Sequence, residues 1–136
     1  MNTLLRLHRF LLLLALLVPF AHAADTAPDF GMPAGTLVVP DGMKVADVQQ
    51  AILLAGSGRG WAVKDKANDK VVLFLEQSGW RSTLTLTYDA KEIQITSDSG
   101  KVDKKTNAIK KQELPSWLRY LKQDITRHLG QKAFSK

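Results

Sequence analysis

The chain has 136 residues, of which 19 are Lys or Arg, 13 are Asp or Glu and none is Cys, and its formal charge is +6 at pH 7. This length predicts one ordinary domain and leaves no room for two domains with a cleft between them. The lack of cysteine excludes disulfides and thiol catalysis, so packing alone must stabilise the fold.

The first 23 residues have the three parts of an export signal. A basic region contains Arg6 and Arg9, an apolar stretch covers residues 10–20, and the small residues Ala21 and Ala23 stand where a signal peptidase needs them. The apolar stretch is shorter than the roughly 20 residues that a membrane-spanning helix needs. We therefore expect residues 1–23 to be a signal peptide cut after Ala23. The rest of the chain is then expected in the periplasm, with no transmembrane segment.

Residues 24–43 form a leader rich in proline and glycine, which excludes a helix there. Within this leader, Thr36–Val39 can add one short strand at the edge of a sheet. The first helix is expected over residues 44–55, because four apolar residues recur three or four positions apart: Val45, Val48, Ile52 and Ala55.

Three glycines between Gly56 and Gly60 follow this expected helix. Loops that bind phosphate precede a helix, at its positive end, whereas this cluster lies at the negative end of one. We therefore expect the cluster to end the helix and to lead into the next strand. Nothing in the sequence singles out Arg59 within it.

Four segments alternate apolar and polar residues, as strands with one buried face do. They cover residues 60–64, 70–77, 80–88 and 91–97, and Trp61 shares the buried face of the first with Val63. The connections have hairpin lengths, which predicts an antiparallel meander. The opposite face is expected to stay in contact with water and carries Thr83, Thr85, Thr87, Gln94 and Thr96.

An apolar stripe at helical spacing closes the domain: Leu114, Trp117, Leu118, Leu121, Ile125 and Leu129. Pro115 suits a first helical turn and Gly130 suits a left-handed cap, so this helix is expected to end at Gly130. Together the elements predict a two-layer α+β fold: a helix, a four-stranded antiparallel meander and a helix, with both helices on one face of the sheet. The domain is expected to cover residues 44–130, followed by a tail of residues 131–136.

Several short motifs resemble those of a family of small exported proteobacterial proteins of unassigned function. They are Ala51–Ala55, Arg59–Trp61, Tyr88–Asp89, Trp117–Leu118 with Leu121, and Asp124–Ile125, and together they span residues 44–129. The resemblance implies an envelope location and a helix–sheet–helix fold, and it implies no known chemistry. The polar residues that the family carries before its last tryptophan have no counterpart in Ile109–Trp117, so no role is transferred to this segment.

Catalytic and metal sites bring several titratable groups together, and histidine is the commonest of them. Beyond the expected signal peptide, His128 is the one histidine, and we expect it in the last turn of the final helix, where a cation is favoured. Most carboxylates fall in predicted turns, although a two-carboxylate site like those of glycosidases stays open. We expect no enzymatic activity, no catalytic or metal-binding residue and no cofactor.

Basic residues concentrate in the last part of the chain. Residues 24–100 carry 7 basic and 10 acidic residues, whereas residues 101–136 carry 10 basic and 3 acidic ones. One interpretation is a solvated loop that only aids solubility. The other is a face that attracts an anionic partner. The candidate binding residues are Lys101, Lys104, Lys105, Lys110, Lys111, Arg119, Lys122 and Arg127.

Two functions therefore stay open. The favoured one is a non-enzymatic envelope binding module whose basic C-terminal face contacts an anionic envelope lipid or polymer, or an acidic envelope protein. The alternative is a small inhibitor or capping protein that binds an envelope enzyme through a strand edge or the threonine-rich sheet face. Nucleic acid is not an expected partner, because an exported protein rarely meets it and the tryptophans are spaced for a core.

Overall fold

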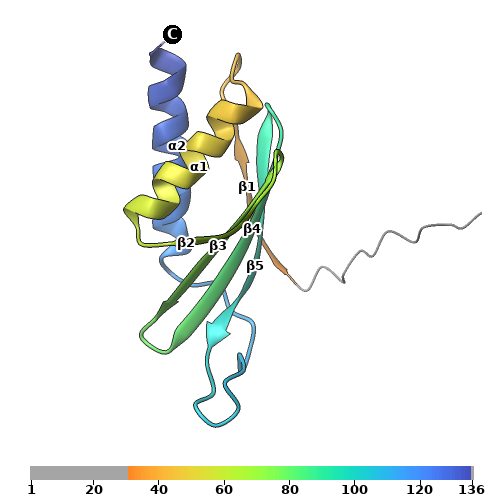
Figure 1. Ribbon diagram of the computed structural model, residues 1–136, viewed down its shortest axis with the longest axis vertical. Helices are drawn as coiled ribbons and strands as arrows, with labels where there is room; N and C mark the ends of the chain where they lie inside the picture. The colour runs from red at the N-terminus through yellow and green to blue at the C-terminus, as the bar shows by residue number, and fades with distance from the viewer. Residues whose placement is uncertain (1–30, 136) are drawn as a thin grey trace, which may run out of the picture.

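The computed structural model describes residues 31–135 (Figure 1). The expected signal peptide and the first residues of the leader lie outside the described residues. The elements are β1 (Met32–Val38), α1 (Val45–Gly58), β2 (Ala62–Lys66), β3 (Lys70–Gln77), β4 (Trp80–Tyr88), β5 (Glu92–Lys101) and α2 (Leu118–Phe134).

The strands form one antiparallel sheet in the order β1-β5-β4-β3-β2. The α+β class is therefore correct, but the sheet has five strands rather than four. The additional strand is β1, which overlaps the short edge strand expected over Thr36–Val39, pairs with β5 and places Leu37 opposite Ile93. A register shift between Pro33 and Gly35, where the φ of Gly35 is +115°, lets this proline- and glycine-containing segment pair at an edge.

Helix α1 begins where the backbone N–H of Lys44 donates to Asp47 Oδ2 at 3.1 Å. It continues through Gly56 to Gly58, past its expected end, because Gly56 allows a close approach to β3: a Cβ there would lie 3.1 Å from Leu73 Cδ1. The chain leaves the helix at Gly60, which takes a left-handed φ of +79°. The N–H of Trp61 then donates to the carbonyl of Gly56, which closes the helix with a Schellman motif.

Both helices lie on the same side of the sheet, and the core fills the space between the two layers (Figure 1). Burial there removes the apolar face of each element from water, which is the main favourable term in folding. The side chains at the centre of this core are 2 % exposed or less: Ile52, Val71, Leu73, Leu84, Leu86, Ile93, Ile95, Leu121 and Ile125. On the other face of the sheet Thr87 and Gln94 are exposed, while Thr83, Thr85 and Thr96 are partly buried.

Strand β2 departs from the expected pattern. Trp61 is buried, but Val63 is 47 % exposed and does not share its environment. Val63 is paired with the buried Leu73, so it lies on the core face as expected, and the register shifts only after it, between Val63 and Asp65. Every residue of β2 is exposed, as befits a strand at the edge of the sheet.

Strand β5 is longer than its apolar residues indicated, because its second half buries hydroxyl groups. Ser97 and Ser99 are each 1 % exposed, and Ser82 of β4 is fully buried. The Oγ of Ser99 lies 2.6 Å from that of Ser82 and 2.5 Å from that of Ser97. These hydrogen bonds satisfy the hydroxyls, so polar residues continue the buried face of the sheet.

Helix α2 begins at Leu118 and runs through Gly130 to Phe134. Both expected ends were wrong: Leu114 is 40 % exposed and precedes the helix, and Gly130 lies inside it rather than at a cap. A turn closed by the N–H of Leu118 and the carbonyl of Pro115 precedes the helix. Trp117 at this junction is partly buried and meets Trp80 edge to face, with ring centroids 6.0 Å apart.

Candidate functional site: the lysine loop

Residues 101–111, called the lysine loop here, begin at the end of β5. Figure 1 shows the connection between β5 and α2 projecting beyond the end of the sheet, far from the C-terminus. Its lysines are Lys101, Lys104, Lys105, Lys110 and Lys111, and all five are exposed.

A tight turn shapes the tip of the lysine loop. Asp103 Oδ1 accepts hydrogen bonds from the backbone N–H groups of Lys105 at 2.7 Å and Thr106 at 3.3 Å. These two bonds, together with the charge of Lys110, hold the pKa of Asp103 below its usual value. The N–H of Asn107 donates to the Asp103 carbonyl, and Asn107 takes a left-handed φ of +57°. The carboxylate nearest the lysines therefore serves mainly to hold the backbone of the turn.

Arg81 of β4 ties this turn to the sheet. Its Nη1 donates to the carbonyl of Asn107 at 2.9 Å and its Nη2 donates to Asn107 Oδ1 at 2.8 Å. Its Nε forms an ion pair with Glu76 Oε2 at 2.9 Å. One guanidinium thus joins β3, β4 and the turn, which reduces the conformational freedom of the loop.

The chain then returns beside the end of β5 that β1 does not cover. The N–H of Lys110 donates to the carbonyl of Lys101 at 2.9 Å, and the N–H of Glu113 donates to that of Ser99 at 2.8 Å. The returning chain passes so close to Gly100 that a Cβ there would lie 2.6 Å from Ile109 Cγ2 and would clash with the Lys111 carbonyl. Glycine at position 100 is therefore required by the path of the loop.

Among residues 31–135, no ion pair involves any of the five lysines of the loop. Their ammonium groups are presented to solvent from a backbone that is fixed at its turn, at Arg81 and at Gly100. This arrangement can attract anionic groups.

The three cations of α2 in the predicted set lie outside the lysine loop. Arg119 donates to the hydroxyl of Tyr120 and lies over its ring, with Cζ 4.9 Å from the ring centroid. Lys122 is partly buried, with its ammonium close to Gly35 of β1. Arg127 forms an ion pair with Asp124 at 3.1 Å. The structure therefore gathers the five loop lysines and leaves the three helix cations to separate contacts.

Arg59, which the sequence did not distinguish, joins the two helices. Its Nε donates to Asp124 Oδ2 at 2.5 Å, and its Cζ lies 5.2 Å from the ring centroid of Tyr120. The hydrogen bond and the charge of Arg59, with the charge of Arg127, lower the pKa of Asp124 below its usual value. The residues are 65 positions apart, and only the packing of α1 on α2 brings them together.

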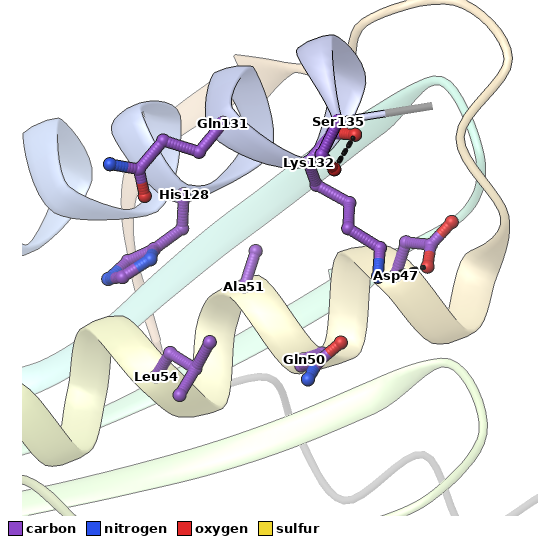
Figure 2. A pocket seen from close by; sticks show the side chains of 8 residues that line it. All are labelled: Asp47, Gln50, Ala51, Leu54, His128, Gln131, Lys132 and Ser135. Carbon is purple, nitrogen blue, oxygen red and sulfur yellow. Dashed lines mark hydrogen bonds and ion pairs between the residues drawn. The ribbon is translucent and has the colours of Figure 1, made fainter.

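A hollow of about 300 Å³ lies between α1 and α2, and Figure 2 shows the side chain of His128 directed into it. His128 is not in the last turn of α2, because the helix continues to Phe134. One end of the hollow carries the ion pair between Lys132 Nζ and Asp47 Oδ1 at 3.6 Å. Leu54, Ala51, two amides and Ser135 supply the remaining lining, and the hydroxyl of Ser135 donates to the carbonyl of Lys132 at 2.9 Å.

Within residues 31–135 no group of three or more His, Asp or Glu side chains is placed to hold a metal ion, and no helix is long and apolar enough to span a bilayer. No protein-family model, no curated protein and no solved structure matches the chain, so the assignment of a function depends on the geometry of its own residues.

Proposed function

We propose that the protein is a non-enzymatic envelope binding module and that the lysine loop contacts an anionic partner, which is a lipid surface or a polymer of the envelope. The observation that carries the proposal is the set of five exposed lysines without ion pairs among the described residues, on a loop that Arg81 and Gly100 hold in place.

The energetics favour a surface with many anionic groups. Each lysine close to an anionic membrane contributes about 1 kcal/mol, so five lysines that reach the surface together support measurable binding at moderate salt. A loop that is already fixed loses less conformational freedom on binding than a mobile tail would. Salt weakens this binding, because a Debye length of about 8 Å at physiological ionic strength screens exposed charges.

Export to the periplasm is part of the same proposal. It is supported by the basic, apolar and small-residue pattern of residues 1–23. The resemblance to small exported proteobacterial proteins supports the same location. N-terminal sequencing of the protein recovered from cells tests the export proposal: a start at Ala24 supports it, and an intact Met1 contradicts it.

The binding proposal is tested by sedimentation with vesicles that contain phosphatidylglycerol, compared with vesicles of phosphatidylcholine alone and with a soluble polyanion. In one variant four lysines of the loop are replaced: Lys104→Gln, Lys105→Gln, Lys110→Gln and Lys111→Gln. We expect this variant to lose at least about tenfold in affinity for the anionic vesicles or polymer, because four favourable charge contacts are removed.

The matched control removes the same charge from exposed lysines outside the loop: Lys44→Gln, Lys64→Gln, Lys66→Gln and Lys91→Gln. We expect it to change the affinity no more than about threefold, a difference of less than 1 kcal/mol. If both variants lose affinity equally, net charge rather than the loop is responsible and the proposal fails.

The alternative function is a capping protein that binds an envelope enzyme, and one observation favours it. Both helices lie on the same side of the sheet, so among the described residues no helix covers the face that carries Thr87 and Gln94 (Figure 1). Edge strands and open faces are common docking surfaces. A stoichiometric protein partner recovered from envelope extract at both low and high salt supports this alternative, whereas recovery of anionic lipid at low salt alone supports the lysine loop.

A further inference from the structure

A second basic surface lies where the connection from β5 ends and α2 begins. It is an open groove of about 430 Å³, lined by Leu114, Pro115, Ser116, Leu118, Arg119 and Lys122. This volume is in the range of small-molecule sites, and such sites combine an apolar lining with a few placed polar groups.

The groove has an apolar floor and wall. Pro115 is buried and Leu118 is 3 % exposed, so both form the floor of the groove with little exposed surface, and Leu114 supplies most of its accessible apolar surface. Leu114 is 40 % exposed although the sequence pattern placed it in the buried stripe. An apolar ligand that covers Leu114 removes this surface from water, which is favourable in proportion to the area buried.

Two cations accompany this apolar surface, and no acidic residue lines it. Arg119 is oriented by its hydrogen bond of 3.0 Å to the hydroxyl of Tyr120. Lys122 extends toward β1, where a Cβ on Gly35 would lie 2.7 Å from its Nζ, so the absence of a side chain at position 35 makes room for the ammonium. The first turn of α2 also contains no acidic residue to oppose the two charges.

We propose that this groove binds a single-chain amphiphile with a phosphate head group. The alkyl chain lies on Leu114, Pro115 and Leu118, and the phosphate lies between Arg119 and Lys122. Charge complementarity selects the head group, because guanidinium and ammonium groups form strong charge-assisted hydrogen bonds with phosphate oxygens. The site goes beyond the proposed function, since it uses none of the five loop lysines and recognises one molecule rather than a surface.

The test is a calorimetric titration of the purified protein with dodecyl phosphate below its micelle concentration. Dodecyl maltoside supplies the same chain with a neutral head, and inorganic phosphate supplies the head without the chain. We expect one dodecyl phosphate to bind per protein, at least about tenfold more tightly than either comparator. Dodecyl maltoside lacks the charged head group, and inorganic phosphate lacks the alkyl chain. Equal affinity for dodecyl maltoside, or no binding of dodecyl phosphate, overturns the proposal.

Two variants locate the site. Arg119→Gln with Lys122→Gln is expected to weaken dodecyl phosphate binding at least about tenfold, and Leu114→Ser is expected to weaken it about fivefold, since an exposed apolar contact is lost. The matched control is Lys104→Gln with Lys105→Gln, which removes the same charge from the lysine loop and is expected to leave the affinity within about twofold.

Thermal unfolding of each variant checks whether the fold is retained. If Arg119→Gln with Lys122→Gln and Lys104→Gln with Lys105→Gln lose equal affinity for dodecyl phosphate, net charge rather than the groove is responsible and the proposal is overturned. Vesicle binding separates this inference from the proposed function. The variant with four loop lysines replaced loses vesicle binding and keeps dodecyl phosphate binding, whereas Arg119→Gln with Lys122→Gln keeps vesicle binding and loses dodecyl phosphate binding.

Discussion

Arg81, Gly100 and Asp103 determine the shape of the lysine loop, although none of them belongs to the predicted binding set. Arg81 holds Asn107, Gly100 lets the returning chain pass, and Asp103 closes the turn. The sequence identifies the lysines by their charge and places Asp103 in a turn, but it does not identify Arg81 or Gly100, because their partners lie far along the chain. The positions of the five lysine charges therefore depend on residues outside the predicted binding set.

The close passage at Gly100 predicts the effect of a single methyl group. Gly100→Ala is expected to lower the free energy of unfolding by about 1–3 kcal/mol, since the chain at Ile109 and Lys111 must move away from β5. Denaturant unfolding measures this change, and weaker binding to anionic vesicles should accompany it. The control is Gly58→Ala, where a Cβ meets no atom within 4 Å. An unchanged midpoint for Gly100→Ala would mean that the loop does not follow this path.

The ion pair between Arg59 and Asp124 predicts a pH-dependent stability. Because the pKa of Asp124 is lowered in the folded protein, its contribution is present in full above about pH 5 and is lost as the pH falls through the folded pKa. Asp124→Asn is therefore expected to lower the denaturant midpoint at pH 7 and to have a smaller effect at pH 3. The comparison is Asp41→Asn, at an exposed position. A difference between wild type and Asp124→Asn that does not depend on pH would contradict this account.

At the scale of elements, alternation and helical spacing located the strands and helices but not all of their ends. Strands β3 and β4 have the expected bounds, because apolar and polar residues alternate through both. Strand β5 extends further, because Ser97 and Ser99 are buried as hydrogen-bonded hydroxyls. Strand β1 includes most of the edge strand expected over Thr36–Val39, but it begins earlier, at Met32, where a segment with proline and glycine pairs through a register shift that no propensity indicates. Polar burial and irregular pairing are the features that sequence periodicity misses.

Gly130 gives a direct test of where α2 ends. It lies inside the helix, and a Cβ there would meet no atom within 4 Å. Gly130→Ala is therefore expected to raise the free energy of unfolding by about 0.5–1 kcal/mol, because alanine loses less conformational freedom on folding. Urea unfolding measures the difference. Destabilisation by a similar amount would indicate a left-handed cap at Gly130 and a helix that ends there.

The docking of α2 predicts unequal roles for two leucines of its apolar stripe. Leu121 is fully buried, and Leu121→Ala is expected to cost about 2–5 kcal/mol. Leu114 precedes the helix and is 40 % exposed, so Leu114→Ala is expected to cost about 1 kcal/mol or less. If denaturant unfolding shows the same loss of stability for both variants, Leu114 is part of the buried stripe and does not line an open groove.

At the scale of the whole molecule, the fold separates charges that are neighbours in sequence. The five loop lysines lie at one end of the sheet, whereas Arg127 pairs with Asp124 beside Arg59 on the interface of the two helices. The sequence predicts a basic C-terminal part of the chain. The structure shows which of its cations are exposed and which form ion pairs. The distribution of ion pairs could not be predicted, because Asp124 pairs with Arg59, which follows α1 and is distant in sequence.

The central claim is that the lysine loop is the contact surface, and NMR spectroscopy tests it most directly. Backbone amides of the protein are followed while nanodiscs that contain phosphatidylglycerol and a spin-labelled lipid are added at two salt concentrations. We predict broadening confined to residues 101–111 and their neighbours on β5, which decreases as salt increases. Broadening centred on Thr87 and Gln94, or on the exposed edge of β2, would contradict the claim and would favour the open sheet face or a strand edge as the docking surface.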